Sequence, residues 1–254
     1  MTLPLESLEE RTQAAVTGAY AKAPPWLREG TALLIRAGSH ACGVALPESD
    51  VDLRGLAIAP RASYFGFAHR FERFACEDPD CEVADIRFFL RSAAEGEPNA
   101  LQVLFCDEGD VLVCSEAGAT LRARRDEILS QRLVKPFAGY VRGQIEKIRR
   151  SNAPARDLAK SAMHALRLTR MLREALVEGK MLIRRPDAAE LLRIRLLTDV
   201  DQVKRVAGEV EEALRGLPDW AAASALPERP DTDAIDELCV ELVSRAVGLP
   251  VTSG

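Results

Sequence analysis

The first third of the chain combines helical spacing of apolar residues with short, continuous apolar runs. Residues 8–20 have helical composition, with Ser7 as the candidate N-cap and Glu10 three residues further on. Residues 32–35 and 51–59 are runs rich in Val, Leu and Ile. Short apolar runs of this kind predict buried strands.

A candidate hairpin and two shorter helices follow. Residues 71–75 and 81–86 flank an acidic turn at residues 77–80, an arrangement typical of paired strands. Residues 86–96 and 100–105 then carry apolar side chains in patterns that favour helices. The front of the chain is therefore predicted to form a small mixed sheet with a few helices around it.

Beyond residue 136 the pattern changes to long helices with apolar residues at helical spacing. Four such segments are separated by short breaks, at residues 137–150, 156–178, 188–197 and 202–214. A further amphipathic helix is predicted for residues 231–248, after a proline-containing connection. We therefore expect a mixed α/β domain over residues 1–136 and an α-helical domain over residues 137–254.

The composition agrees with a helix-rich globular protein. Apolar residues make up 47% of the chain, charged residues 29% and aromatic residues only 5%. Because Ala, Leu and Val fill the apolar positions, helices are favoured over sheet. The first seven residues do not resemble a signal peptide, and no apolar run is as long as a membrane span. We expect a cytoplasmic protein with no membrane contact.

The cysteines and histidines form no recognisable disulfide or zinc pattern. No Cys-x-x-Cys pair occurs, and the three histidines complete no zinc-ligand spacing. The cysteines are Cys42, Cys76, Cys81, Cys106, Cys114 and Cys239. We expect them to be buried free thiols.

The net charge of −5 conceals an uneven distribution. Residues 1–136 carry a balance of −6, residues 137–205 a balance of +8 and residues 206–254 a balance of −7. A basic helical segment can face a polyanion such as a nucleic acid. It can equally be a solvated helix surface, and the sequence leaves both interpretations open.

The most informative segment has Gly-Ser after the first predicted strand and Asp-x-Asp at the start of the second. Gly38 lets the backbone turn tightly and lets a phosphate approach closely, because it has no Cβ. Ser39 would then lie at a helix N-terminus, where backbone N–H groups and its hydroxyl can bind phosphate oxygens. Asp50 and Asp52 are two residues apart on a strand, so their side chains point the same way.

Two adjacent carboxylates repel one another unless a cation lies between them. Oxygen ligands that are completed by water and phosphate are the pattern of Mg²⁺. Each piece alone is weak evidence, since Gly-Ser is a common turn and Ser-Asp-Val-Asp a common loop or capping sequence. Their combination in this order, between two predicted strands, is much rarer. It predicts metal-assisted phosphate chemistry around Asp50 and Asp52.

This segment resembles the signature of the DNA polymerase β nucleotidyltransferase superfamily, in which Gly-Ser is followed after about ten residues by Asp-apolar-Asp-apolar. More narrowly, residues 38–55 resemble the predicted nucleotidyltransferases associated with RNA ligases in RNA repair. The likeness continues through residues 82–90, 99–105 and 160–168. It spans roughly residues 30–200, and the two-aspartate signature is its most specific part.

The resemblance implies an α+β fold, with a polymerase-β-like nucleotidyltransferase core on a small mixed sheet, followed by an α-helical C-terminal domain. It also implies a third carboxylate on a later strand of the sheet. Asp85 is the candidate, because it closes a predicted strand just before a helix. A lone aspartate at such a place is usually a helix N-cap. Beside Asp50 and Asp52 we favour the catalytic role.

The activity implied by the resemblance is transfer of a nucleoside monophosphate from a nucleoside triphosphate to an acceptor hydroxyl, with release of pyrophosphate. Two Mg²⁺ or Mn²⁺ ions are implied, with Asp50, Asp52 and Asp85 as their ligands and Asp85 as a candidate general base. The implied acceptor is an RNA end, and an RNA ligase is the implied partner.

Three further residues are candidates for binding the nucleotide. Lys160 and His164 share the polar face of the helix at residues 156–178, and such a face is commonly a solvated surface. The resemblance includes both residues, however, and a helical domain facing the sheet would direct them toward the triphosphate. Arg54, two residues after Asp52, can hold either a carboxylate or a phosphate.

Two other functions stay open. The first is transfer of AMP to a protein or small molecule, as in antitoxin-like or antibiotic-modifying members of the superfamily. The second is a non-catalytic interaction protein that retains the fold, although the intact motif argues against it. The acidic chain disfavours binding of a long duplex, because phosphate contacts need clustered basic residues. A short RNA end bound in a cleft is compatible with it.

Overall fold

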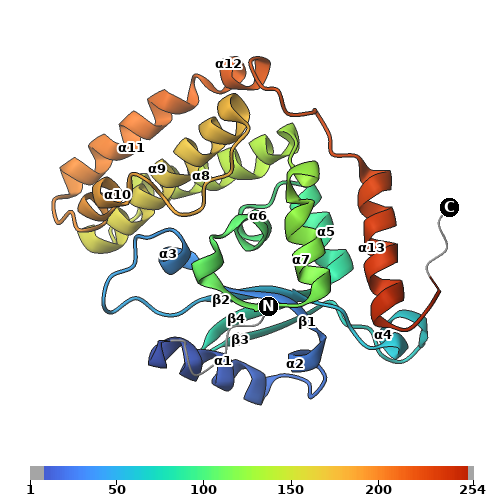
Figure 1. The fold of residues 1–254 in the computed structure, drawn as a ribbon. Coiled ribbons are helices and arrows are strands. Elements are labelled where there is room, and N and C mark those ends of the chain that lie inside the picture. Colours follow the sequence, from blue (N-terminus) through green and yellow to red (C-terminus); the bar gives the residue numbers. More distant parts are fainter. Residues whose placement is uncertain (1–8, 251–254) are drawn as a thin grey trace.

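A computed structural model describes residues 9–250 and has one five-stranded mixed sheet surrounded by helices (Figure 1). The strands lie in the order β3-β4-β2-β1-β5. Their bounds are Thr31–Arg36 (β1), Leu53–Ala57 (β2), Arg73–Glu77 (β3), Asp80–Asp85 (β4) and Val111–Cys114 (β5). Only β2 and β4 pair in parallel, and the other neighbours are antiparallel. The predicted small mixed sheet is confirmed.

The predicted strands correspond to four of the observed ones. The runs at residues 32–35 and 51–59 form β1 and β2, and the predicted hairpin is β3 and β4, paired antiparallel. Sequence reasoning missed β5, because its short apolar run gives no clear periodicity. β5 pairs with β1 and so places β1 in the interior of the sheet.

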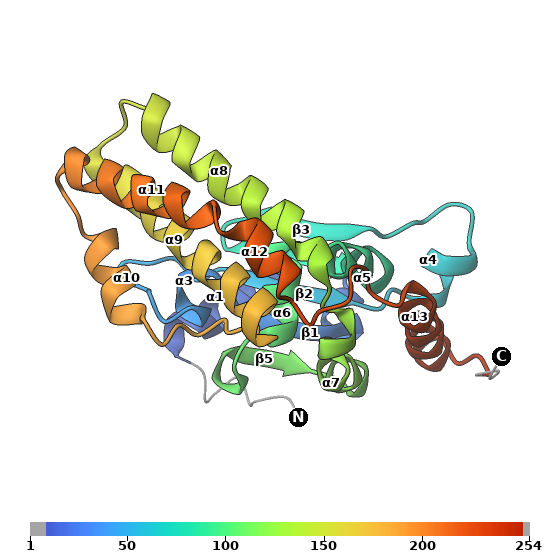
Figure 2. The ribbon, with the colours of Figure 1, turned by 90° about the horizontal axis from the view of Figure 1, so that it is seen from above.

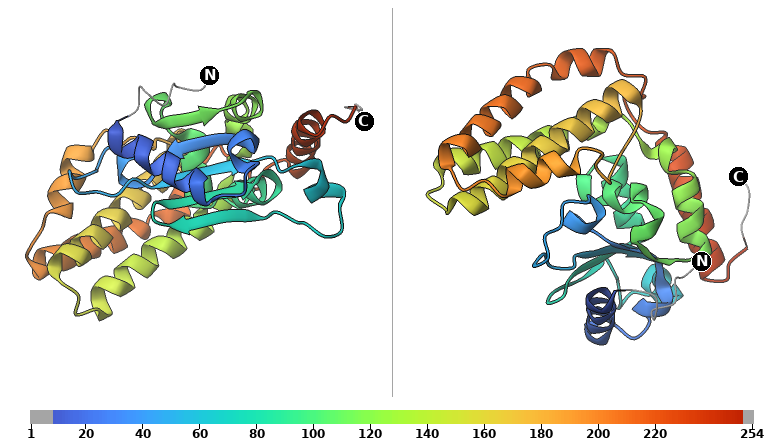
Figure 3. Two further views of the ribbon diagram at one scale, coloured as in Figure 1. Left: turned by 90° about the horizontal axis from the view of Figure 1, so that it is seen from below. Right: turned by 60° about the vertical axis from the view of Figure 1, so that its left-hand side comes forward.

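Helices cover both faces of the sheet. α1 (Glu10–Lys22) and α2 (Leu27–Gly30) lie on one face, where α1 crosses the strands (Figure 3). The other face carries α5 (Ile86–Ala94), α6 (Pro98–Phe105) and α7 (Glu116–Ala123) (Figure 1). The first predicted helix is therefore α1, whereas its candidate cap Ser7 lies outside the described residues.

The back half is a helical bundle built around one long helix. α9 (Ala155–Glu178) packs against α8 (Val134–Arg150), α10 (Ala188–Arg195) and α11 (Val200–Leu214) (Figure 2). α13 (Thr232–Ala246) leaves the bundle and packs against α5. The remaining short helices are α3 (Gly38–Ala41), α4 (Arg61–Phe65), α12 (Leu217–Ala222), η2 (Glu108–Asp110), η3 (Arg125–Ile128) and η4 (Gln131–Leu133). The predicted long helices are thus present.

The hydrophobic core is continuous from the sheet into the bundle. A single cluster of buried residues includes Leu33 on β1, Phe137 on α8, Leu172 on α9 and Leu242 on α13. The boundary expected near residue 136 therefore separates two parts that share one core. The division into two domains stays a prediction.

Buried ion pairs fix the bundle against the loop that follows β1. Asp110 is fully buried and binds Arg36 of β1 at 3.1 Å and Arg184 of the α9–α10 connection at 2.6 Å. The next residue, Arg185, is also buried, and its backbone N–H donates to the carbonyl of Cys42 at 3.1 Å. These contacts hold the start of α10 close to α3.

Two simpler expectations can be compared directly with the structure. Cys42, Cys81 and Cys106 are buried free thiols, and burial raises the pKa of Cys81 to about 12 and that of Cys106 to about 11. Within residues 9–250, no helix combines the length and apolar character needed to cross a membrane.

Replacing the buried carboxylate tests the role of these ion pairs. We expect Asp110→Ala to lower the free energy of unfolding by about 3 kcal/mol, because Arg36 and Arg184 lose their shared partner. Urea denaturation followed by circular dichroism measures this change. Glu212→Ala is the control, since its pair with Arg215 is exposed and should contribute less than about 1 kcal/mol. Equal effects of the two substitutions would contradict the assigned role.

Candidate active site

The loop after β1 and the residues that enter β2 are in direct contact. The backbone N–H of Ala37 donates to the carbonyl of Asp52 at 2.8 Å. Gly38 has a φ of 62°, in the region that favours glycine. A Cβ placed on Gly38 would lie 1.9 Å from Oδ2 of Asp52. Glycine is therefore required at position 38 both by the backbone conformation and by the neighbouring carboxylate.

A buried glutamine holds this loop in place. The backbone N–H of Gly38 donates to Oε1 of Gln102 at 3.1 Å, and Nε2 of Gln102 donates to the carbonyl of Gly38 at 3.4 Å. Nε2 also contacts Sγ of Cys42 at 3.3 Å. Sequence reasoning missed Gln102, although a single polar residue inside the apolar helix α6 is a detectable signal.

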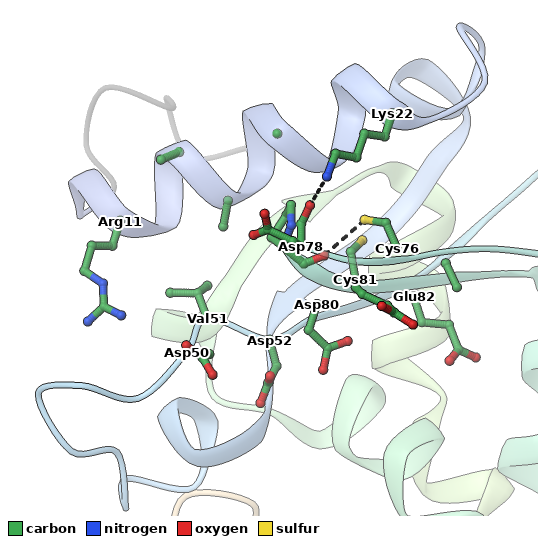
Figure 4. Close-up of a pocket in the computed structure, with 16 residues that line it drawn as sticks. Arg11, Lys22, Asp50, Val51, Asp52, Cys76, Asp78, Asp80, Cys81 and Glu82 are labelled. Carbon is green, nitrogen blue, oxygen red and sulfur yellow. Dashed lines mark hydrogen bonds between the residues drawn. The ribbon is translucent and has the colours of Figure 1, made fainter.

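Three carboxylates lie side by side where β2 and β4 begin. The parallel register pairs Leu53 with Cys81, so the residues just before them, Asp52 and Asp80, are neighbours. Asp50, Asp52 and Asp80 lie in a row at the edge of a pocket (Figure 4). The third carboxylate at this end of the sheet is therefore Asp80, which sequence reasoning had assigned to the turn.

The surroundings of Asp52 shift the pKa of its carboxyl group. Burial, and then the charge of Asp80, raise the pKa of Asp52, while Arg54 and Lys160 lower it. Arg54 pairs with Asp80 at 2.9 Å. Of the two roles considered for Arg54, the structure shows the carboxylate partner. Arg54 thus holds Asp80 beside Asp52.

The donor set is compatible with a divalent cation. Among residues 9–250, no three Asp, Glu, His or Cys side chains form a ready-made metal site. Asp52 and Asp80 nevertheless offer hard oxygen atoms, and their repulsion is what a divalent cation would relieve. These residues fit a Mg²⁺ ion that takes its remaining ligands from water and phosphate.

Asp85 lies elsewhere, and its assignment to this group is corrected. The register pairs it with Ala57, five residues along β2 from Asp52, which corresponds to about 16 Å. Asp85 is buried, accepts from the backbone N–H of Arg87 at 3.0 Å and caps α5. It also accepts from the hydroxyl of Tyr64 at 3.0 Å and from Nε of Arg87 at 2.7 Å. Asp85 is an N-cap that joins α4 to α5.

A small cavity brings the carboxylates face to face with cations of the bundle. It has a volume of about 250 Å³ and is lined by Ser39, Asp50 and Asp52 from the sheet side. Lys160 and Asp157 of α9 and Arg195 of α10 line the other side, and Arg156 of α9 pairs there with Glu48 of the facing loop. The fold therefore brings together four residues that the sequence nominated, Ser39, Asp50, Asp52 and Lys160.

Positive charge is concentrated behind this cavity, around His164. Burial, followed by the charges of four cations, lowers the pKa of His164 to about 3, so its imidazole is neutral. The four cations are Arg167, Lys160, Arg195 and Lys147. In the described part of the chain none of them pairs with a carboxylate, and Nε of Arg167 is buried without a partner. Such a recess favours an anionic ligand.

A second, larger recess lies on the other side of the same carboxylates. It has a volume of about 1130 Å³ and is lined by α1, by the β3–β4 hairpin and by Asp50 and Asp52 (Figure 4). Its other charged residues are Arg11, Lys22, Glu77, Asp78, Asp80 and Glu82. Asp50 and Asp52 therefore line two cavities, of which the larger has the more acidic lining.

Comparisons with known proteins identify a matching family. Residues 28–241 match the model of a family described as "RNA repair pathway DNA polymerase beta family". No curated protein matches the chain. A solved nucleotidyltransferase-like protein from Exiguobacterium sibiricum 255-15 shows 14% identity, with 82% of this chain and 76% of that chain covered and a TM-score of 0.33.

The raised pKa of Asp52 generates a stability test. A folded-state pKa above the unfolded value means that ionised Asp52 destabilises the fold above that pKa, and that this effect vanishes below the unfolded pKa. We expect Asp52→Asn to raise the Tm at pH 7 in the presence of a chelator, with a smaller gain as the pH falls toward 4. Calorimetry measures both. A variant less stable than the wild type throughout would contradict the charge arrangement.

A matched pair of substitutions separates Asp80 from Asp85. We expect Asp85→Ala to lower the free energy of unfolding by about 3 kcal/mol, because Tyr64 and Arg87 lose their acceptor and α5 its cap. The Tm increase caused by Mg²⁺ should survive. Asp80→Ala should change stability by less than about 1 kcal/mol, since the pair with Arg54 is partly exposed, but remove the Mg²⁺ effect. The reverse pattern would restore Asp85 as the third carboxylate.

Proposed function

The chain belongs to the RNA repair pathway DNA polymerase beta family and is a nucleotidyltransferase of the polymerase β type, and on this basis we propose which reaction its site performs. The protein transfers a nucleoside monophosphate from a nucleoside triphosphate to a hydroxyl group of an RNA end. The observation that carries this proposal is the cavity in which Asp50 and Asp52 face Lys160 and Arg195. The arrangement of Asp50 and Asp52 opposite Lys160 and Arg195 matches a metal-bound triphosphate.

The cationic wall is the proposed site of the β- and γ-phosphates. Lys160 is exposed to the cavity and Arg195 lines it. Arg195 donates to the hydroxyl of Ser49 at 3.1 Å and has no carboxylate partner in the described residues. The hydroxyl of Ser39 faces the same space, and Gly38 leaves room for a phosphate to approach. His164 is neutral and lies among these cations without adding to their charge.

The acidic wall is the proposed reaction centre. Asp50, Asp52 and Asp80 would hold Mg²⁺ or Mn²⁺ as two ions, which supply activation of the acceptor hydroxyl and neutralisation of the leaving pyrophosphate. Arg54 orients Asp80, and the Gly38 loop orients Asp52. The acceptor oxygen forms a bond to the α-phosphorus while the bond to the β-phosphate oxygen breaks. The hydroxyl proton passes to a carboxylate of this wall or to water.

The acceptor is assigned to RNA because of the family and the basic bundle. The +8 balance of residues 137–205 includes Lys160 and Arg195, which line the cavity. An RNA ligase acting on the same RNA ends fits as a partner, and the cytoplasm as the location. The acidic lining of the larger recess favours a second candidate, an uncharged or cationic acceptor such as a protein or small molecule that receives AMP.

Labelled nucleotides test the proposal. The protein is incubated with each α-labelled nucleoside triphosphate, Mg²⁺ or Mn²⁺, and RNA, DNA or protein acceptors. We expect a labelled RNA product. In Asp52→Asn the rate of its formation should fall by about a hundred- to a thousandfold. Lys160→Ala should raise the KM for the nucleotide, because it removes a phosphate contact.

Arg215→Ala is the matched control, because Arg215 is an exposed arginine paired with Glu212 and should leave transfer unchanged. Label on a protein or small molecule instead of RNA would favour the second candidate. No label on any acceptor, with Asp50→Ala and Asp52→Asn unchanged in nucleotide and metal binding, would rule out the enzyme.

A further inference from the structure

The connection between β2 and β3 carries exposed aromatic rings at the far end of the sheet from Asp50, Asp52 and Asp80. We call residues 58–71 the aromatic arm, and it contains α4. α4 lies at the end of the sheet opposite to α3 and α10, as both views in Figures 1 and 2 show. Phe65 is 65% exposed and Phe67 is 101% exposed. None of the residues that line the small cavity between Asp52 and Lys160 belongs to this arm.

The arm is held in a defined position rather than collapsed onto the core. The hydroxyl of Tyr64 donates to Asp85 at 3.0 Å and accepts from the backbone N–H of Ala59 at 3.1 Å. The guanidinium of Arg87 lies 4.4 Å from the centre of the Tyr64 ring and pairs with Asp85. Burial and the charge of Asp85 raise the pKa of Tyr64 further above its ordinary value, so its hydroxyl remains a donor. The exposed rings are therefore presented to solvent by a buried anchor.

The charge of the arm is opposite to that of the whole protein. The arm contains Arg61, His69 and Arg70 and no Asp or Glu, whereas the chain carries a net charge of −5. Arg61 shares a recess with Glu29 and Glu116, so Arg70, which is exposed, is the clearer contact for an anion. Flat aromatic faces next to arginine match stacked bases and phosphates of a single strand.

We propose that the aromatic arm is a binding site for single-stranded RNA, with Phe65 and Phe67 stacking on bases and Arg70 contacting phosphate. The charge complementarity favours a polyanion over a protein partner. This inference rests on the proposed function, because RNA as the ligand is taken from it. The arm holds a strand at one end of the sheet, while the reaction centre acts at the other.

Binding of a labelled oligonucleotide tests the proposal without any transfer reaction. The probe is a fluorescent single-stranded RNA of about 12 nucleotides, and fluorescence anisotropy gives its Kd with no nucleotide present. We expect Phe67→Ala to weaken binding by roughly fivefold or more, because one stacking contact is lost. Phe65→Ala should act in the same direction. Arg70→Ala should reduce the slope of log Kd against log salt by about 0.7.

The controls separate this proposal from the proposed function. Leu196→Ala removes another exposed apolar side chain, 57% exposed on the bundle, and should leave the Kd unchanged. Arg215→Ala removes an exposed arginine outside the arm and should likewise leave the Kd unchanged. If no transfer is found but binding still depends on Phe67, the arm stands and the enzymatic proposal fails. A wild-type protein that binds no RNA, or arm variants with unchanged Kd, would contradict the proposal. This holds also if the arm is found to bind a protein partner instead.

Discussion

The contact between Gly38 and Asp52 is the constraint on which the rest of the site depends. A side chain at position 38 would overlap the Asp52 carboxylate, so the loop after β1 and the entry to β2 can approach only through glycine. Gln102 supports this approach from α6 by binding both main-chain groups of Gly38. The close approach places Ser39 and the carboxylates on one cavity wall. Without it, Ser39 and the carboxylates could not line the same cavity.

A second feature is that Lys160 and Arg195 face Asp50 and Asp52 without forming salt bridges with them. Arg54 occupies one side of Asp80, but Lys160, Arg167 and Arg195 have no carboxylate partner in the described residues. If the cations and carboxylates of the two walls were joined by salt bridges, a ligand would have to break them before binding. The buried ion pairs around Asp110 and Arg185 set the distance between the walls. Arg156 and Glu48, which also line the cavity, do form a salt bridge, so a ligand meets both paired and unpaired charges there.

The parts of the site that follow from local sequence could be predicted. Gly38 with Ser39, and Asp50 with Asp52, each depend on a few neighbouring residues beside a strand, although Asp50 and Asp52 lie just before β2 rather than on it. The third carboxylate depends on the register between β2 and β4, which no local pattern specifies. Asp80-x-Glu82 at the start of a strand repeats the acid-x-acid form of Asp50-x-Asp52 and is the signal that was available. Arg167 and Arg195 lie near the site only because α9 and α10 pack there.

The same register explains why Asp85 resembles a catalytic residue in sequence without lying near Asp50 and Asp52. β4 carries a carboxylate at each end, and because β2 and β4 are parallel, Asp80 lies near Asp52 and Asp85 near the end of β2. The second carboxylate is buried and bound by Tyr64 and Arg87, so its charge is used to fix α4. One strand therefore supplies an acid to each end of the sheet. If the aromatic arm binds single-stranded RNA, then β4 connects the anchor of the arm at Asp85 to Asp80 beside Asp52. The length of β4 then sets the distance between the site that holds the RNA and the site that modifies it.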